Sequence, residues 1–379
     1  MLSIFLLIFF YGLFTLLILI LSFFLSFLLF FFFFFCYSIV GLVMKMAETF
    51  VFADQTNRLI VTRKPLPALV SQPPVGKNGI VSAVPKGVDG NQHCRHNELT
   101  MGPAYVPEYS AEIGDYLLVA ERSHYRDPSY MVNQPEVTER MRMILVDWLV
   151  DVAIKFKLHP ESFYLAIDIV DRYLCAKKVS RAKLQLVGIS AVLLSAKHEE
   201  IWPPGIKDCV FICANTYSAE EVFQMERDIA LTLRFRFTVP TTYPLACHFL
   251  DSGDTEAMVR DATFFFLESA SHNYEMLQYL PSRIAAASVL LGRLLVAWNR
   301  SLDRSNISQE KLWDREMIHV SRGITLDEIF SLSEKLLSFT KTLSSSSSKL
   351  QAIRRKYVSQ KFASVASLEM PSLSAVFVS

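Results

Sequence analysis

From Glu108 onwards the chain carries repeated helical patterns of apolar residues, and no alternating strand pattern persists. The segment from Leu184 to Ala196 is apolar on nearly every side, which predicts a buried central helix with Lys183 and Lys197 at its ends. The segment MRMILVDWLVDV instead predicts an amphipathic helix with one buried stripe. Its apolar residues recur three and four positions apart, at Met141, Ile144, Leu145, Trp148, Leu149 and Val152.

One charged residue lies on the apolar face of a predicted helix. The segment SAEEVFQMERDIALTL opens with Ser218 and Glu221 at capping-box spacing, and its apolar phase runs through Val222, Ile229 and Leu233. Glu226 falls on the same phase. A core-facing carboxylate costs several kcal/mol unless it is paired, so we expect a partner, and Lys197 at the end of the buried helix is a candidate. The alternative is that Lys197 only complements its helix dipole.

Pro, Gly and Ser residues divide the chain. A boundary at residues 239–242 separates two helical blocks, 108–239 and 240–362, and the serine run Ser344 to Ser348 separates the last two helices. Residues 363–379 form a tail that we expect to be poorly ordered. Residues 45–107 are rich in Pro, Gly and polar residues without periodicity, which predicts a disordered leader. The fold class is therefore all-α, with two domains.

Residues 1–44 contain no Lys, Arg, Asp, Glu or His. A stretch of this length and apolarity is long enough to span a bilayer. Its low complexity also suits a mistaken gene model, in which translation begins at Met44 or Met46. Both readings stay open, and membrane association follows only from the first.

Composition and charge limit the classes of function that the chain can have. The net charge of +1 argues against nucleic-acid binding through a broad basic face. The six cysteines lack framework spacing; Cys209 and Cys213 lie one helical turn apart without a nearby His or second Cys pair, which favours buried packing over zinc. No Gly-rich phosphate loop, nucleophile motif or metal cluster appears. The pattern favours a protein-interaction module without a cofactor over an enzyme.

The residues themselves resemble a known family. Arg142 to Leu149 (RMILVDWL), followed by Leu158, Phe163, Ala166-Ile167 and Asp171-Arg172-Tyr173, resembles the cyclin-box signature at each spacing. SAKHEEIWPP and TVPT follow in order. YLPSRIAAASVLLGRL and LQAIRRKYVSQKFASVA resemble the closing elements of A- and B-type, mitotic cyclins. The resemblance covers roughly residues 108–366. It implies two tandem cyclin boxes, each a five-helix bundle around a buried central helix, and a non-catalytic subunit that activates a cyclin-dependent kinase at the G2/M transition.

The resemblance also implies roles for particular residues. Lys197 and Glu226 resemble the pair that grips the kinase, and Phe235 is expected to contact the kinase too. Arg142 and Asp171 resemble an internal ion pair above the core residue Leu186. A third set resembles the docking patch for Arg-x-Leu motifs of substrates and inhibitors, namely Met141, Leu145, Trp148, Asp151, Leu184 and Gln185. Two positions depart from the pattern: His198 stands where Phe or Tyr is usual, and Pro204-Gly205 varies a loop ending.

Mitotic cyclins are destroyed periodically, and the leader contains a matching motif. Arg63 and Leu66 stand in RKPLPALVS, which is similar to a destruction box except that Ser71 replaces the usual Asn. Such a motif implies a ubiquitin ligase as a partner, although a random match gives the same letters. The family further implies nuclear and cytoplasmic localisation. Rival hypotheses are a transcription factor with paired cyclin folds, which needs a zinc ribbon and a basic DNA-facing surface, and a membrane-tethered helical adaptor.

Overall fold

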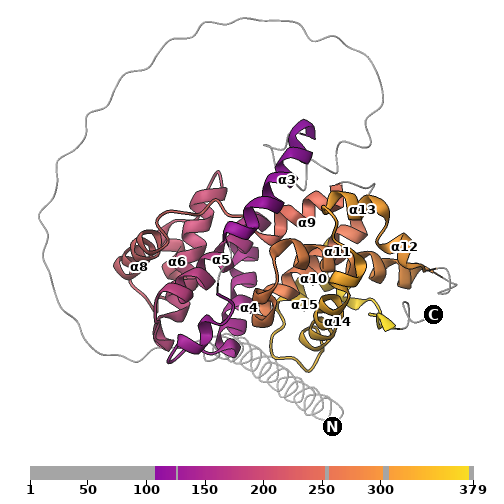
Figure 1. Ribbon diagram of the computed structural model, residues 1–379. Coiled ribbons are helices and arrows are strands. Elements are labelled where there is room, and N and C mark those ends of the chain that lie inside the picture. The colour runs from indigo at the N-terminus through magenta and orange to yellow at the C-terminus, as the bar shows by residue number, and fades with distance from the viewer. Residues whose placement is uncertain (1–106, 125–126, 252–255, 302–306, 375–379) are drawn as a thin grey trace, which may run out of the picture. The chain divides into compact units, whose positions relative to one another are not determined.

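A computed structural model describes residues 107–124, 127–251, 256–301 and 307–374 (Figure 1). Within these ranges every regular element is an α-helix or a short 3-10 helix, as the sequence predicted. The apolar segment 1–44 and the leader with its candidate destruction box lie outside the described residues.

The first domain is built around helix α6 (Leu184–Glu199). Every residue of α6 from Leu184 to Ala196 is buried, which confirms the predicted central helix. The helices α5 and α8 pack against α6. Around α6 the domain places α4 (Glu139–Phe156), α5 (Pro160–Ala176), α7 (Ile206–Ile212) and α8 (Ala219–Thr232), and α3 (Ser110–Ala120) precedes them. The 3-10 turn η1 (Pro107–Tyr109) precedes α3, and three further 3-10 turns connect the helices: η2 (Glu121–His124), η3 (Tyr130–Asn133) and η4 (Arg181–Lys183).

Local hydrogen bonds fix where the two informative helices begin. The Thr138 hydroxyl accepts from the Met141 N–H and so caps α4, which ends at Lys157 in the left-handed region. At α8 the predicted capping box is present: Ser218 accepts from the Glu221 N–H, and the Glu221 carboxylate accepts from the Ser218 N–H.

The second domain repeats the plan around α11 (Pro281–Arg300), which packs against α9 (Thr242–Asp251), α10 (Ala257–His272) and α14 (Leu326–Leu343). Gly292 lets α11 approach α10, because a Cβ there would lie 2.8 Å from the Thr263 backbone N. Among the described helices α11 is long and apolar enough to cross a membrane, but 72% of its apolar window is buried, so it is a core helix. The remaining elements are η5 (Tyr274–Gln278), α12 (Gln309–Leu312), α13 (Arg315–Val320), α15 (Ala352–Val358), η7 (Gln360–Phe362) and η8 (Val365–Ser367).

The segment after Lys361 differs from its prediction. Residues 363–374 pack on the second domain: Val365 and Leu373 are buried, and the Asn299 side chain donates to the Glu369 carbonyl. The prediction of a poorly ordered tail is wrong for these residues. Val365 and Leu373 are isolated apolar residues without helical periodicity, so the sequence pattern did not predict that this segment is packed.

Helix α4 is buried on two sides. The predicted stripe is buried at Leu145, Trp148, Leu149 and Val152, whereas Met141 and Ile144 are half-buried. The side outside the predicted stripe is buried as well, at Arg142, Val146, Asp147 and Val150. The reason is that α4 packs against α10 and α15 of the second domain in addition to α5 and α6 (Figure 1).

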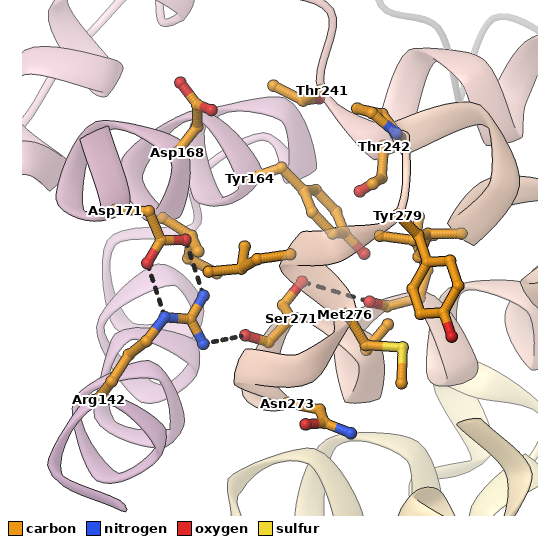
Figure 2. Close-up of a pocket in the computed structure, with 16 residues that line it drawn as sticks. Arg142, Tyr164, Asp168, Asp171, Thr241, Thr242, Ser271, Asn273, Met276 and Tyr279 are labelled. Atoms are coloured by element: carbon orange, nitrogen blue, oxygen red, sulfur yellow. Dashed lines mark hydrogen bonds and ion pairs between the residues drawn. The ribbon is translucent and has the colours of Figure 1, made fainter. Parts of the chain in front are cut away.

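Arg142 joins three helices at this domain junction (Figure 2). Its Nε lies 2.6 Å from Asp171 Oδ1 and its Nη2 lies 2.8 Å from Oδ2, both side chains being fully buried. Its Nη1 donates to the Ser271 carbonyl of α10 at 3.0 Å, and the Tyr130 hydroxyl donates to Asp171 Oδ1 at 2.7 Å. The predicted ion pair is therefore present, and it also bridges the two domains. Leu186 is buried in the first domain, as predicted.

Burial alone would lower the pKa of Arg142, but the charge and hydrogen bonds of Asp171 outweigh it, so the pKa is raised and the guanidinium stays charged. The cavity beside it, lined by Arg142, Tyr164, Ser271 and Met276 among others, has a volume of about 60 Å³. This is well below the roughly 300–1,000 Å³ of ordinary small-molecule sites. We therefore interpret the junction, which we call the joint, as a structural contact between the two domains and not as a small-molecule site.

A second polar network reinforces the junction. Asp147 of α4 accepts from the Ala352 N–H at the start of α15 at 3.1 Å, and His272 Nε2 lies 3.5 Å from the same carboxylate. Glu268 of α10 accepts from the Tyr357 hydroxyl at 2.8 Å and pairs with Lys356. Helix α15 is therefore fastened to both α4 and α10.

We predict that Arg142→Ala destabilises the protein by about 3–5 kcal/mol, because it leaves the buried Asp171 carboxylate without its cation. The change is measured as a loss in the free energy of unfolding in urea. The double variant Arg142→Met/Asp171→Leu removes both charges and should lose less. An Arg142→Ala variant within ~1 kcal/mol of the wild type would contradict the role of the joint.

Glu161, at the start of α5, is expected to make the folding stability depend on pH. The Thr241 hydroxyl, at the boundary between the domains, donates to its carboxyl oxygens at 2.8 and 3.0 Å. Burial raises the pKa of Glu161 to about 8; the hydrogen bond from Thr241 opposes this rise, and the charges of Glu199 and Asp168 add to it. From the ordinary pKa of 4.5 up to about 8, the folded chain keeps a proton that the unfolded chain releases, so stability falls as pH rises through this interval.

We predict that Glu161→Gln removes this loss, because Gln keeps an acceptor for Thr241 and does not ionise. Urea unfolding at about pH 5 and about pH 8 should show the variant gaining stability relative to the wild type as pH rises. A difference in stability between the variant and the wild type that does not change with pH would argue against a raised pKa of Glu161.

Candidate functional site

An ion pair between α6 and α8 forms the first candidate site. Lys197 Nζ lies 2.5 Å from Glu226 Oε1, with 46% of the Lys197 side chain and 12% of the Glu226 side chain exposed. Glu226 is thus the buried carboxylate that the apolar phase of α8 predicted, and Lys197 is its partner. The ammonium group reaches solvent at the end of α6, while the carboxylate sits at the domain surface beneath it.

Helix α7 packs against α6 and α8, the two helices that carry the pair. The Cys209 thiol is buried and lies close enough to be influenced by both charges. Burial raises the pKa of Cys209 and of Cys213 to about 12, as expected for thiols packed in a core. Among the described residues no group of three or more His, Cys, Asp or Glu side chains is placed to hold a metal ion. The pair of cysteines is part of the core.

Phe235 follows α8 in a strained loop. Arg234 and Phe235 both have positive φ, 53° and 56°, a conformation that non-glycine residues adopt at a cost of about 1–3 kcal/mol each. The Phe235 N–H donates to the Ala230 carbonyl at 2.9 Å, which holds the turn. The ring is 67% exposed. A large apolar side chain held in solvent by a strained backbone indicates a contact surface.

Further exposed apolar side chains come from the elements around the pair. Ile201 and Trp202 follow α6, Phe211 lies on α7, and Phe223 and Leu231 lie on α8. Trp202 is 89% exposed. Large apolar groups exposed on neighbouring elements are consistent with an interaction surface. Sequence reasoning did not select these five residues; the signal was present in Ile201 and Trp202, two large apolar residues in a polar loop before Pro203-Pro204.

The second candidate site is the surface where α4 crosses the start of α6. Leu145 packs against Gly188, where an added Cβ would lie 2.8 Å from Leu145 Cδ1. Trp148, Leu184 and Gln185 are also largely buried, and Met141 is half-buried, so the predicted docking patch is shallow. The Gln185 side-chain carbonyl oxygen is buried and has no hydrogen-bond partner within the described residues.

Asp151 lies one helical turn beyond Trp148 and is not free. Both of its carboxylate oxygens accept from Arg355 Nη2 of α15, each at 2.8 Å. The side chains are 41% and 56% exposed for Asp151 and Arg355, respectively. The sequence placed Asp151 in the patch but gave no sign of its partner, which comes from the second domain.

Comparison with known proteins settles the family. The cyclin N-terminal domain model matches residues 112–238, and the cyclin C-terminal domain model matches residues 240–371. A soybean (Glycine max) G2/mitotic-specific cyclin, S13-7, is 37% identical over 253 residues, which are 67% of this chain and 92% of the relative. The chain belongs to the cyclin family. More narrowly, it falls in the mitotic A/B group.

Other relatives of this cyclin are of the same kind. G2/mitotic-specific cyclin-1 of Antirrhinum majus is 38% identical, over 72% of this chain and 54% of the relative. Cyclin-A1 of Xenopus laevis is 36% identical, over 71% of this chain and 61% of the relative. The cyclin spans little more than half the length of these two. A viral cyclin from herpesvirus saimiri shares the fold, with a TM-score of 0.50 and 20% identity over 61% of this chain and 95% of the viral one.

The structure also accounts for the two departures from the family pattern. His198 packs edge-on against Phe237 with ring centroids 6.2 Å apart, so an aromatic ring still fills that position. Gly205 precedes α7, and its N–H donates to the Asp208 carboxylate at 2.9 Å. Neither residue forms part of the Lys197–Glu226 pair.

We predict that Lys197→Ala lowers stability by about 1–2 kcal/mol, because it leaves a mostly buried carboxylate unpaired. Glu226→Ala should cost less, since the Lys197 ammonium already reaches water. The double variant should be no less stable than Lys197→Ala alone, as measured by urea unfolding. A double variant that fails to fold would show that the pair belongs to the core and not to a surface site.

Proposed function

We propose that this cyclin binds and activates a cyclin-dependent serine/threonine protein kinase and thereby promotes the G2/M transition and mitosis. The observation that carries the proposal is the Lys197–Glu226 pair, half-open to solvent and accompanied by exposed apolar residues of the same elements, Phe235 and Trp202 among them. Apolar and aromatic anchors around a desolvated polar centre are typical of strong protein interfaces. Each charge of the pair keeps hydrogen-bonding capacity for a partner's backbone.

The proposed mechanism is a shift in population. A kinase alone holds its regulatory helix and activation loop in an inactive arrangement for most of the time. Because the cyclin surface fits the active arrangement better, binding raises the population of that arrangement, in which the catalytic Lys–Glu pair of the kinase forms. The cyclin supplies binding energy and no reacting group; ATP, magnesium and the phosphoryl transfer all belong to the kinase. In this role the chain is a regulator and not an enzyme.

We further propose that the α4–α6 surface helps to select substrates and inhibitors that carry Arg-x-Leu motifs. Leu145, Trp148 and Leu184 would receive the Leu side chain, and Gln185 would turn its unpaired carbonyl oxygen, buried in the free chain, toward the peptide backbone. Asp151 supplies the opposite charge for the motif's Arg. Docking at a surface apart from the kinase site would raise the local concentration of substrate.

Two proposals concern parts of the chain that the structure does not describe. We propose that Arg63 and Leu66 belong to a destruction box through which a ubiquitin ligase recognises the leader. We also propose that the protein works in the nucleus and the cytoplasm. Membrane association depends on residues 1–44, and nucleic acid is not among the proposed partners.

We predict that Lys197→Ala/Glu226→Ala lowers affinity for the kinase at least ~100-fold, because central polar contacts of a desolvated interface cost several kcal/mol when truncated. Affinity is measured by titration with purified kinase, and activation by phosphate transfer to a short peptide. The matched control Arg300→Ala/Glu256→Ala removes an exposed ion pair of the second domain and should bind normally. Undiminished binding of the first variant would refute the assignment.

We predict that Trp148→Ala reduces phosphorylation of an Arg-x-Leu substrate roughly ten-fold, since it removes a central aromatic contact of the patch. A short peptide that lacks the motif should be phosphorylated at the wild-type rate, because the kinase-binding surface is untouched. The two rates are compared with the same purified kinase complex. Equal losses on both substrates would indicate a folding defect and not a docking surface.

A further inference from the structure

The acidic residue of the docking patch already has a cationic partner. Arg355 extends from α15 and donates to both carboxylate oxygens of Asp151 at 2.8 Å. An incoming Arg side chain needs the same two oxygens, because a guanidinium binds a carboxylate through paired N–H donors. The arginine of a bound motif must therefore displace Arg355 or share the carboxylate with it, and in the second case two positive charges lie side by side.

We propose that Arg355 is a specificity-determining residue of the docking patch, which weakens the preference for a basic anchor by occupying Asp151. The inference rests on the proposed docking function. Selection by the patch then depends mainly on the apolar residue of the motif, and a peptide without the Arg is bound almost as well. To use Asp151, a ligand must displace Arg355 and tolerate a second positive charge beside its own.

Arg355 is not needed to hold its own helix. Helix α15 is anchored by the Ala352 N–H on Asp147 and by the Tyr357 hydroxyl on Glu268, and Ile353 is buried. Arg355 lies on the opposite, solvent-facing side, and 56% of its side chain is exposed. Replacing it changes the charge of the patch while the domain junction stays intact.

The same solvent-facing side carries apolar groups. Ile154 lies one turn beyond Asp151 on α4, Val358 lies one turn beyond Arg355 on α15, and both are exposed. Since α4 and α15 pack against each other, the ion pair is flanked by apolar surface on both helices. A peptide bound here can gain apolar contacts without any ionic contact to Asp151.

The expected effect follows from the exposure of the pair. An exposed ion pair is worth about 0.2–1 kcal/mol, so releasing Asp151 should tighten binding of a basic ligand by up to roughly five-fold, the equivalent of ~1 kcal/mol. An uncharged ligand gains nothing, because it does not use Asp151. The difference between the two ligands separates competition for Asp151 from a general change of the surface.

The test uses the full-length chain and two fluorescent peptides that differ only in having Arg-x-Leu or Ala-x-Leu. Dissociation constants are measured by fluorescence anisotropy at low salt for the wild type, Arg355→Gln and the matched control Arg354→Gln, which removes the same charge from the neighbouring position. We expect the wild type to bind the two peptides within about two-fold of each other. Arg355→Gln should bind the Arg peptide up to about five-fold tighter and the Ala peptide unchanged. Arg354→Gln should behave as the wild type.

A further variant, Arg355→Gln/Asp151→Asn, should lose the gain, because the carboxylate that the Arg peptide would use is absent. The inference is overturned if Arg355→Gln leaves the Arg peptide unchanged, if it tightens both peptides equally, or if Arg354→Gln has the same effect. If no peptide binds the wild type or Arg355→Gln, or if Trp148→Ala leaves binding unaltered, then the docking function itself fails, and the inference fails with it. Far-UV circular dichroism and urea unfolding of each variant show that the chain is folded.

Discussion

The buried guanidinium of Arg142 is the constraint on which the arrangement of the two domains depends. A charged group without solvent must be fully paired, and Arg142 is paired by the Asp171 carboxylate of α5 and the Ser271 carbonyl of α10. Since these partners belong to different domains, satisfying one side chain fixes α4, α5 and α10 together. The Asp147 contacts to the start of α15 and to His272 then extend the same joint along α4. Met141, Leu145, Trp148 and Asp151 of the proposed docking patch lie on α4, so this joint also fixes their position.

The two proposed surfaces lie at opposite ends of one rigid helix. Leu184 and Gln185 begin α6 at the docking patch, and Lys197 ends it at the kinase-binding surface. At 1.5 Å per residue these ends lie about 20 Å apart. Because α6 is buried along most of its length, that separation cannot vary. In the proposed complex, a substrate at the patch would be kept at a fixed distance from a kinase bound at Lys197 and Glu226. An activator without catalytic residues would influence substrate choice in this way.

The features that sequence predicts well are local. The central helix, the capping box of α8 and the buried carboxylate of Glu226 all follow from periodicity and from short-range hydrogen bonding. The family resemblance then supplied roles that periodicity could not supply, such as those of Phe235 and Trp148. Contacts between the domains stayed hidden because they join residues that are far apart in the sequence. The resemblance predicted that Arg142 pairs with Asp171, but nothing in the sequence indicated the contacts of Arg142 with Ser271, of Asp147 with Ala352 or of Asp151 with Arg355. The exposure of Phe211 is equally hidden, since an apolar residue in a predicted helix is assumed to be buried.

Hydrogen exchange on the full-length chain, with and without an equimolar purified cyclin-dependent kinase, tests the central claim most directly. The account predicts slower exchange at the end of α6, in the loop that carries Ile201 and Trp202, and in α8 through Phe235, together with the appearance of kinase activity. The α4–α15 surface should be unaffected until an Arg-x-Leu peptide is added. A stable, active complex in which these segments exchange as in the free chain would contradict the account, because the kinase would then be bound elsewhere.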